Sequence, residues 1–222
     1  MKTIVITGTD KGIGYALCQK FLAEGHEVIA TCYGACPHTH ERMHGVALDL
    51  SRPESIVSCI QEISAFGKKI DIVINNAGIL ADEEETSVVA EKLRKTLEVN
   101  LIGTIDFTQR ILPLLHEGAH IVNISSTAGS LGLVGKVSHF MGHYPAYKIS
   151  KAALNMYTRT LALELKEQGV TVSSVHPGWV QTDMGGEEAT LTPEQAADGI
   201  YQTAIDPPET GGFWHMGELL PW

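Results

Sequence analysis

TGTDKGIG, residues 7–14, is a glycine-rich turn between a predicted strand and a predicted helix. The β-branched run at residues 3–6 is typical of a buried parallel strand, and the apolar residues from 13 to 22 recur at helical spacing. Glycine allows tight or positive-φ backbone, while the first N–H groups of a helix and its dipole attract phosphate. The pattern favours a nucleotide-binding turn. The structural alternative is an ordinary glycine-rich turn.

Length and charge limit the classes of protein that fit. The 222 residues predict one domain, residues 1–222, and the apolar content of 44% is ordinary for a globular chain. The net charge of −10 argues against nucleic acid or an anionic membrane as the main partner. No apolar run approaches the roughly 18 residues of a membrane span, and the first residues do not resemble a signal peptide. We therefore expect a cytoplasmic protein.

The cysteines and histidines predict no metal site. No two cysteines form a Cys-x2-Cys pattern, so we expect reduced and mostly buried thiols. Three histidines near one cysteine form a loose cluster, but no second ligand group of standard spacing accompanies it, which favours a solvated loop. These residues are Cys18, Cys32, Cys36 and Cys59, with His38, His40 and His44.

Predicted strands and helices alternate along the whole chain. Further strands are expected at residues 27–32, 45–48, 70–74, 120–124, 170–175 and 212–215, and helices at 53–66, 88–97, 101–115, 146–166 and 193–204. The helix at 101–115 should be disturbed near Pro113. Continuous apolar strands alternating with helices predict an α/β fold of the Rossmann type, a doubly wound parallel sheet with helices on both faces. A ligand should then lie at the carboxyl ends of the strands.

Polar residues follow four of these strands at the point where each ends. Asp49 follows the third strand, and Asn75-Asn76-Ala77-Gly78 closes the fourth. Ser125-Ser126 follows the fifth, and Pro177-Gly178 the sixth. Turn residues are needed at strand ends in any protein, but paired amides and paired hydroxyls at one edge favour a binding site.

Tyr147 and Lys151 are four residues apart in a predicted helix, so their side chains share one face. A neighbouring cation favours phenolate, and Lys151 would bring the Tyr147 pKa down from its usual value of about 10. Tyr144 and Lys148 repeat this spacing. From the spacing alone, a catalytic pair and a chance surface pair are equally good interpretations.

Together these motifs resemble the short-chain dehydrogenases/reductases. The matching stretches are the glycine turn, Asn75–Gly78, Ser126, Tyr147-x2-Ser150-Lys151 and Pro177-Gly178-x-Val180-x-Thr182, with Asn100 between them. The resemblance covers nearly the whole chain, and its Tyr-x-x-Ser-Lys signature selects Tyr147 over Tyr144. It implies hydride transfer between a nicotinamide and a carbonyl or alcohol substrate.

The resemblance also implies a role for each residue. Tyr147 would give a proton to the carbonyl oxygen and Ser126 would hydrogen-bond it, while Lys151 lowers the Tyr147 pKa and holds the ribose. Asn100 would support a water-linked proton path. The implied catalytic set is Asn100, Ser126, Tyr147 and Lys151. The implied cofactor contacts are Gly8, Asp10, Lys11, Gly12, Ile13, Gly14, Tyr33, Asp49, Leu50, Asn76, Ala77, Gly78, Asn100, Tyr147, Lys151, Pro177, Gly178, Val180 and Thr182.

Residues 176–186 and 219–222 narrow the resemblance to the C-factor and sniffer branch of carbonyl-reductase-like members. Two departures stand out. Ser126 and Tyr147 are 21 positions apart, longer than the family's usual gap, so residues 130–143 should form an extra loop by the site. The segment after Thr182 is short, which predicts a small substrate lid.

The predicted cofactor is NADP(H), with NAD(H) as the alternative. Residues 31–34 contain no acid to bind a ribose 2′-hydroxyl and repel a 2′-phosphate, and Lys11 stands in the glycine turn. Tyr33 argues the other way, because many NADP-preferring relatives carry arginine there. The expected substrate is a small aldehyde, ketone or quinone. A nucleotide-sensing or signalling protein with little turnover is the alternative function.

The same resemblance predicts a homodimer or a homotetramer. The helices at 101–115 and 146–166 form the usual subunit contact in the proteins that it resembles. They carry more apolar residues than one core-facing stripe requires: Ile105, Ile111, Leu154, Leu161 and Leu165. The alternative is that all of these face the chain's own sheet.

Overall fold

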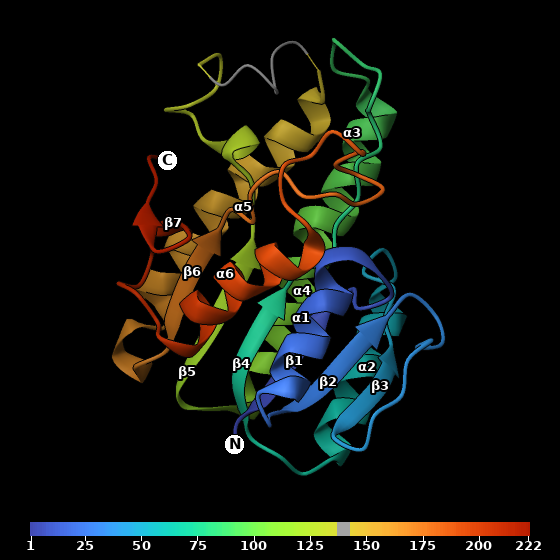
Figure 1. Ribbon diagram of the computed structural model, residues 1–222, viewed down its shortest axis with the longest axis vertical. Coiled ribbons are helices and arrows are strands. Elements are labelled where there is room, and N and C mark those ends of the chain that lie inside the picture. Colours follow the sequence, from blue (N-terminus) through green and yellow to red (C-terminus); the bar gives the residue numbers. More distant parts are fainter. Residues whose placement is uncertain (137–142) are drawn as a thin grey trace.

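The computed structural model describes residues 1–136 and 143–222, and it contains a sheet in the order β3-β2-β1-β4-β5-β6-β7-β8 (Figure 1). The strands are β1 Thr3–Thr7, β2 Glu27–Cys32, β3 Met43–Ala47, β4 Ile70–Asn75, β5 Leu115–Ile124, β6 Thr171–Val175, β7 Phe213–His215 and β8 Glu218–Leu219. The helices are α1 Gly12–Ala23, α2 Pro53–Ala65, α3 Ala90–Leu97, α4 Thr104–Ile111, α5 Pro145–Glu164 and α6 Pro193–Ile205. All neighbouring strands pair in parallel except β8, which runs antiparallel to β7.

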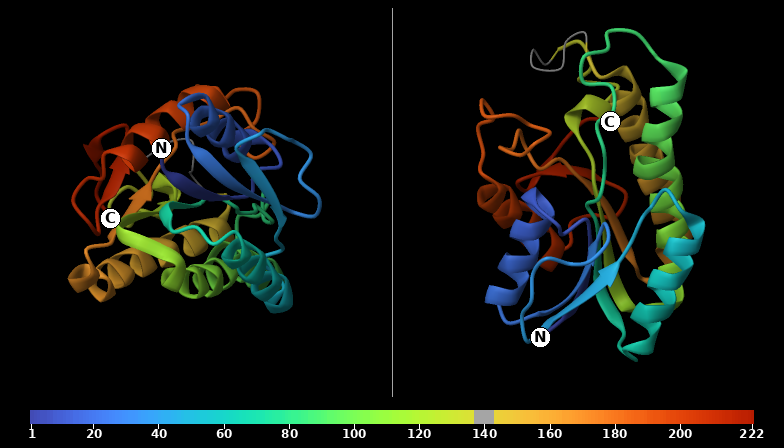
Figure 2. Two further views of the ribbon diagram at one scale, coloured as in Figure 1. Left: turned by 90° about the horizontal axis from the view of Figure 1, so that it is seen from below. Right: turned by 90° about the vertical axis from the view of Figure 1, so that its right-hand side faces the viewer.

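Alternation along the strands builds one apolar core on each face of the sheet. On β1, Ile4 and Ile6 pack in the core beneath α1 and α6, and Val5 packs in the core beneath α2, α4 and α5. Figure 2 shows these two helical layers with the sheet between them. Each fully buried isoleucine stabilises the fold by about 1.5–3 kcal/mol. The predicted doubly wound α/β fold with helices on both faces is confirmed.

Three elements differ from the sequence-based predictions. The chain stays helical around Asn100, because a π-helix, η1 (Glu98–Gly103), joins α3 to α4 where we expected a break. Strand β5 begins at Leu115, earlier than predicted, directly after a 3-10 turn (Leu112–Leu114) that contains the expected disturbance at Pro113. The short strand β8 was not predicted at all.

The sheet order places a change of winding direction between β1 and β4. The chain runs outward from β1 to β3, then crosses to β4 and runs the other way. At such a point the loops after β1 and β4 turn to opposite faces, which leaves a crevice at the carboxyl edge of the sheet. The glycine turn follows β1 and Asn76–Gly78 follows β4, so both lie at this edge. No helix in the described part of the chain is both long and apolar enough to cross a membrane.

Candidate functional site

The glycine turn presents a helix N-terminus that no side chain caps among the residues that the structure describes. Helix α1 begins at Gly12, and Lys11 in front of it makes no side-chain cap. Gly8 and Gly12 have φ angles of +71° and +58°, which other residues adopt at a cost. The first N–H groups of α1 therefore have no partner within the helix and suit a phosphate oxygen. This donor set fits a dinucleotide pyrophosphate.

The loop after β4 holds the glycine turn in place. Asn76 Nδ2 donates to the carbonyl oxygens of Thr7 and Gly8, at 2.9 and 3.1 Å. Thr7 Oγ1 in turn accepts from the backbone N–H groups of Asn76 and Ala77, both at 3.0 Å. A Cβ added to Gly14 would overlap the Gly8 carbonyl oxygen. The predicted cofactor residues of β1 and β4 thus form one interlocked cradle.

Ser126, Tyr147 and Lys151 meet at the same edge of the sheet. Ser126 follows β5 and its Oγ accepts from Ala128 N at 3.1 Å, which caps the short 3-10 turn Thr127–Gly129. The Tyr147 phenol, in the first turn of α5, lies close enough to the Ser126 hydroxyl for that hydroxyl to act on its pKa. Lys151 Nζ donates to the Ile124 carbonyl oxygen at 2.8 Å and lies 5.5 Å from the centroid of the Tyr147 ring.

Burial, rather than Lys151, sets the acidity of the Tyr147 phenol. Burial raises the Tyr147 pKa to about 12, and the Ser126 hydroxyl acts in the opposite direction. Lys151, whose ammonium donates to the Ile124 carbonyl oxygen, is not among the groups that shift this pKa here, so its expected effect on the Tyr147 pKa stays a prediction. Burial also lowers the pKa of Lys151 to about 8. At neutral pH the phenol is therefore protonated and the ammonium keeps its charge.

Asn100 lies in η1 with all of its amide engaged. Its Oδ1 accepts from Ile79 N at 2.7 Å, while Nδ2 donates to Ile79 O at 2.9 Å and to Ser150 Oγ at 3.1 Å. A Cβ on Gly78 would lie 3.3 Å from Asn100 Oδ1 and 3.6 Å from Lys151 Nζ. Gly78 therefore leaves open the space between these two side chains. Short π-helical segments within α-helices, such as η1, are frequent at functional sites.

A buried polar row beneath the site was not predicted. Asn75, Asn123 and Ser174 are register partners across β4, β5 and β6. Asn75 Nδ2 donates to Asn123 Oδ1, and Asn123 Nδ2 donates to Thr158 Oγ1 of α5, both at 2.8 Å. Thr158 also hydrogen-bonds to Ser174 at 2.9 Å. Because buried polar groups are costly without partners, this row fixes α5 against the sheet in one register.

Asn155 on α5 links that row to the segment that carries Ser126. Its Oδ1 accepts from Ser125 Oγ at 2.6 Å and from Ser174 Oγ at 3.1 Å, and Nδ2 donates to Gly129 O at 3.4 Å. The contacts to Ser125 and Gly129 flank Ser126 on both sides. The sequence held a signal for this role of Asn155, because it lies four positions after Lys151 and therefore shares the same helical face.

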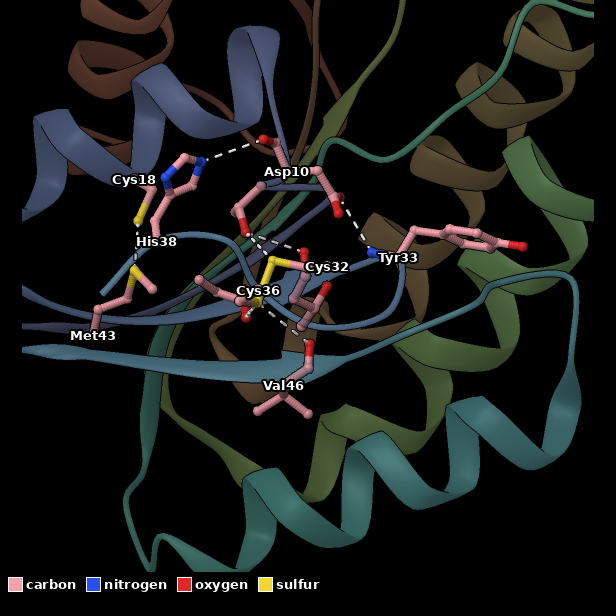
Figure 3. Close-up of a disulfide and its surroundings, with 11 residues drawn as sticks. Asp10, Cys18, Cys32, Tyr33, Cys36, His38, Met43 and Val46 are labelled. Carbon is pink, nitrogen blue, oxygen red and sulfur yellow. Dashed lines mark hydrogen bonds between the residues drawn. A yellow bond between two sulfur atoms is a disulfide. The ribbon is translucent and has the colours of Figure 1, made fainter. Parts of the chain in front are cut away.

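The loop after β2 is tied to the glycine turn (Figure 3). Asp10 Oδ2 accepts from Tyr33 N at 3.2 Å, and its carbonyl oxygen lies 3.3 Å from His38 Nε2. Asp10, a predicted cofactor contact, therefore orients the turn that carries Tyr33. Tyr33 is 76% exposed, which leaves its ring available at this edge.

Cys32 and Cys36 form a disulfide in that same loop, which corrects the expectation of four reduced thiols (Figure 3). Cys32 ends β2, and the turn that follows brings the two Cα atoms to 5.2 Å, within the range that a disulfide spans. The sequence argument failed because it relied on compartment and ignored this geometry. Cys18 and Cys59 are free and buried, as expected.

Thiol titration checks this disulfide. Unfolded protein without reductant should show two thiols, Cys18 and Cys59, and reduced unfolded protein should show four. In the native protein both free thiols should react slowly, because burial raises the pKa of Cys18 to about 11 and that of Cys59 to about 12. Four thiols in unreduced, unfolded protein would contradict the disulfide. A Cys36→Ser variant is the control and should show three.

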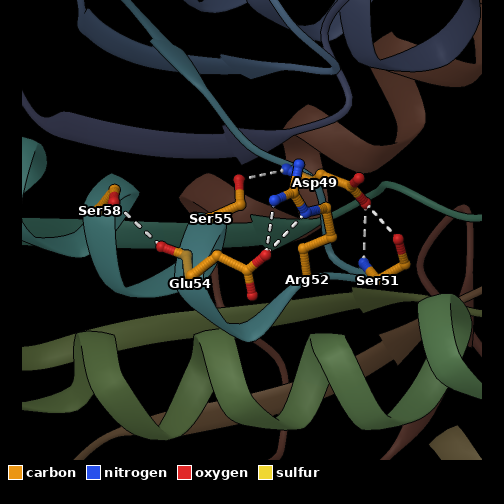
Figure 4. A network of polar contacts seen from close by, with 6 residues as sticks. All are labelled: Asp49, Ser51, Arg52, Glu54, Ser55 and Ser58. Atoms are coloured by element: carbon orange, nitrogen blue, oxygen red, sulfur yellow. Dashed lines mark hydrogen bonds and ion pairs between the residues drawn. The ribbon is translucent and has the colours of Figure 1, made fainter.

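Asp49 is oriented by its own loop (Figure 4). Its Oδ1 accepts from Ser51 N at 2.9 Å and from Ser51 Oγ at 2.6 Å, and its N–H donates to Ser55 Oγ at 2.9 Å. The Leu50 side chain, by contrast, packs in the core on the α2 and α4 side. A cofactor contact at Leu50 would have to come from its backbone, and it stays a prediction.

The segment after β6 closes the site from the other side. A Cβ on Gly12 would lie 3.2 Å from Thr182 Cγ2, so this segment approaches the glycine turn closely. Gly178 has a φ of +91°, and Val180 forms a bridge with Leu191. Lys11 forms an ion pair with Asp183, both side chains being about three-quarters exposed. These residues lie beside the cradle, as the sequence predicts for Pro177–Thr182.

The chain end covers the first part of the long segment between Ser126 and α5. Ser130 Oγ donates to Pro221 O and Gly132 N donates to Trp222 O, both at 2.7 Å. The predicted extra loop at 130–143 is therefore anchored at its start, and its part at 137–142 lies outside the described residues. Within the described ranges, no group of three His, Cys, Asp or Glu side chains is placed to hold a metal ion.

Comparisons with known proteins agree with this geometry. A family profile described as short chain dehydrogenase matches residues 2–191. The chain is 33% identical to a 1-hydroxy-2-glutathionyl-2-methyl-3-butene dehydrogenase from a Rhodococcus species, over the full length of both. Its fold resembles the carbonyl reductase Sniffer of D. melanogaster, with a TM-score of 0.90, 30% identity and full coverage of both chains. It also resembles an NADPH-bound carbonyl reductase from chicken fatty liver, with a TM-score of 0.90, 29% identity and coverage of 100% and 99%.

Proposed function

Because this chain belongs to the short chain dehydrogenase family and is an NAD(P)-dependent enzyme, we propose that it transfers hydride between NADP(H) and a small carbonyl or alcohol substrate. The expected substrates are aldehydes, ketones or quinones. One observation carries the proposal: the Tyr147 phenol lies close enough to the Ser126 hydroxyl for that hydroxyl to act on its pKa, and both lie beside Lys151 at the edge where the cofactor cradle lies. We also propose that residues 1–222 form one domain.

A reduced nicotinamide held in the cradle would supply the hydride for the carbonyl carbon. Tyr147 donates its phenolic proton to the carbonyl oxygen as that oxygen gains negative charge, so the product is an alcohol. Ser126 donates a hydrogen bond to the same oxygen, and both contacts strengthen as charge develops. Lys151 would hold the ribose through its ammonium, and Asn100 keeps the Ile79 backbone and the Ser150 side chain in place.

A carbonyl panel tests this proposal against the nucleotide-sensing alternative. Purified protein with NADPH should oxidise the cofactor when an aldehyde, a ketone or a quinone of the right shape is added, as followed by the absorbance of reduced nicotinamide. Cofactor binding without turnover on any member of the panel would favour the sensing function instead.

Lys11 supports the NADP(H) preference. Its ammonium pairs with the Asp183 carboxylate, and both are exposed, so a 2′-phosphate can replace that partner at little cost. Residues 31–34, at the end of β2 and just after it, also contain no acidic residue that would repel a 2′-phosphate. We propose that Lys11 binds the 2′-phosphate.

Lys11→Ala should lower kcat/KM with NADPH by about three- to tenfold and leave NADH almost unchanged, because only NADPH carries the phosphate. The measurement is kcat/KM with both cofactors on one substrate. Asp183→Asn is the matched control, since it frees Lys11 and should not weaken NADPH. A loss shared equally by both cofactors would show that this role of Lys11 is wrong.

Exposed apolar residues on α5 support the proposal that the protein is a homodimer or a homotetramer. Most of the apolar residues on which the prediction relied are buried within this chain, so they do not support it: Ile111, Leu154, Leu161 and Leu165. Exposed apolar residues take their place. Ile149, Met156 and Leu163 recur every seven positions along α5, with exposed fractions of 41%, 65% and 77%. Such a stripe covers one side of a helix and suits a symmetric contact.

Light scattering should give a mass at least twice 24.0 kDa at micromolar concentration. Met156→Glu should shift the protein toward the monomer, because it places charge in the centre of the stripe. Lys166→Glu, outside the stripe, is the control for the added charge. A wild-type mass near 24.0 kDa would refute the oligomer.

A further inference from the structure

The first turn of α5 carries Tyr147 but has no cap of its own. Tyr144 is the N-cap residue, and it makes no side-chain cap hydrogen bond and has a φ of +61°. Pro145 follows with no N–H to donate. Ala146 is therefore the first residue of the helix with a backbone donor that needs a partner, and Tyr147 comes directly after it. Helix ends without caps fray.

Asp82, from the loop after β4, supplies the missing cap. Its Oδ2 accepts from Ala146 N at 2.6 Å, across 64 positions of sequence. The residue is only 1% exposed, which is unusual for an aspartate. Its other oxygen, Oδ1, is buried and has no hydrogen-bond partner in the described part of the chain. Burying a carboxylate in this way is costly, so the single bond to α5 has to offset that cost.

A second contact clamps the same turn to the same loop. Tyr144 N donates to the carbonyl oxygen of Glu85 at 3.2 Å, and the Glu85 side chain pairs with Lys92 of α3 at 2.5 Å. The loop that contains Asp82 starts at Gly78 and Ile79, and both of these residues lie against Asn100. One segment thus touches Asn100 at one end and the start of α5 at the other.

We propose that Asp82 is a positioning residue for Tyr147. It acts as an N-terminal cap of α5 that is supplied from another segment of the chain. Without this acceptor the first turn of α5 would open, because Ala146 N would lose its partner and Pro145 offers none. The phenol would then leave the Ser126 hydroxyl, while Lys151, one turn further along and bonded to Ile124 O, would stay in place. The proposal rests on the proposed function for its kinetic readout only.

Asp82→Ala tests the proposal, with Glu83→Ala as the matched control that removes a neighbouring exposed acid. We expect kcat to fall by about 10–100-fold in Asp82→Ala, because a displacement of about 1 Å can cost that much. The dissociation constant for NADPH should change by less than about twofold, since the cradle is untouched. Asp82→Asn keeps an acceptor oxygen and should recover most of the lost kcat.

Amide hydrogen exchange separates this proposal from the proposed function, because it needs no substrate. The amides of residues 146–148 should exchange faster in Asp82→Ala than in wild type, while those at 154–161 should not change. Unchanged exchange at 146–148 would overturn the proposal even if kcat fell. Faster exchange with unchanged kcat would also overturn it, because the cap would then not position Tyr147. If Asp82→Ala does not fold, Asp82→Ser, whose shorter side chain ends before Ala146 N, takes its place in both measurements.

Discussion

Tyr147→Phe should lower kcat by about 10²–10⁴-fold while the affinity for NADPH stays nearly constant. The substitution removes one oxygen, and the ring still packs in the first turn of α5. The lost group is a proton donor that burial keeps protonated at neutral pH, since the Tyr147 pKa is raised to about 12. Ser126 loses its partner at the same time, and it cannot replace the proton because its hydroxyl is far less acidic.

The measurement is steady-state kcat with NADPH and the best carbonyl substrate, together with a cofactor titration by fluorescence. Tyr144→Phe is the matched control, because it makes the same chemical change three residues earlier, at a side chain that makes no cap hydrogen bond to α5. That variant should keep most of its activity. A Tyr147→Phe enzyme with more than half of the wild-type kcat would refute the assignment of the proton donor.

The fold was predictable because its signals are local and periodic. Strand β2 at Glu27–Cys32, for example, is buried along its whole length, and glycines stand two positions beyond each of its ends. The edge at which the site forms followed from the rule for doubly wound sheets. The pairing of Ser126 with Tyr147 was anticipated from the family resemblance, since no spacing rule brings together residues that lie 21 positions apart.

The features that escaped prediction depend on tertiary contacts. The π-turn at Asn100 is held by bonds to Ile79 and Ser150, which come from two other segments. The i,i+4 rule placed Lys151 on the face of Tyr147, but it could not show that the ammonium is directed to Ile124 O. In the sequence, Asp82 is one of several acidic residues in a polar loop. Only the folded structure shows that it is buried against the start of α5.

Gly14→Ala should weaken NADPH binding by about 10–100-fold, the equivalent of the 1–3 kcal/mol that overpacking usually costs. The new methyl would overlap the Gly8 carbonyl oxygen and would lie 2.5 Å from Asn76 Nδ2. Backbone cannot rotate away as a flexible side chain can, so the turn after β1 must shift. The Asn76 bonds to Thr7 and Gly8 would be strained by the same movement, and the free N–H groups of α1 would no longer face the phosphates.

The dissociation constant for NADPH, measured by fluorescence, is the readout, with circular dichroism to verify that the variant is folded. Gly199→Ala in α6 is the matched control, because it also adds a methyl within a helix but meets only the flexible side chain of Met216, at 3.3 Å. It should bind NADPH normally and be no less stable, since alanine favours helix more than glycine does. A folded Gly14→Ala protein with wild-type affinity for NADPH would show that the cofactor phosphates bind somewhere other than the glycine turn.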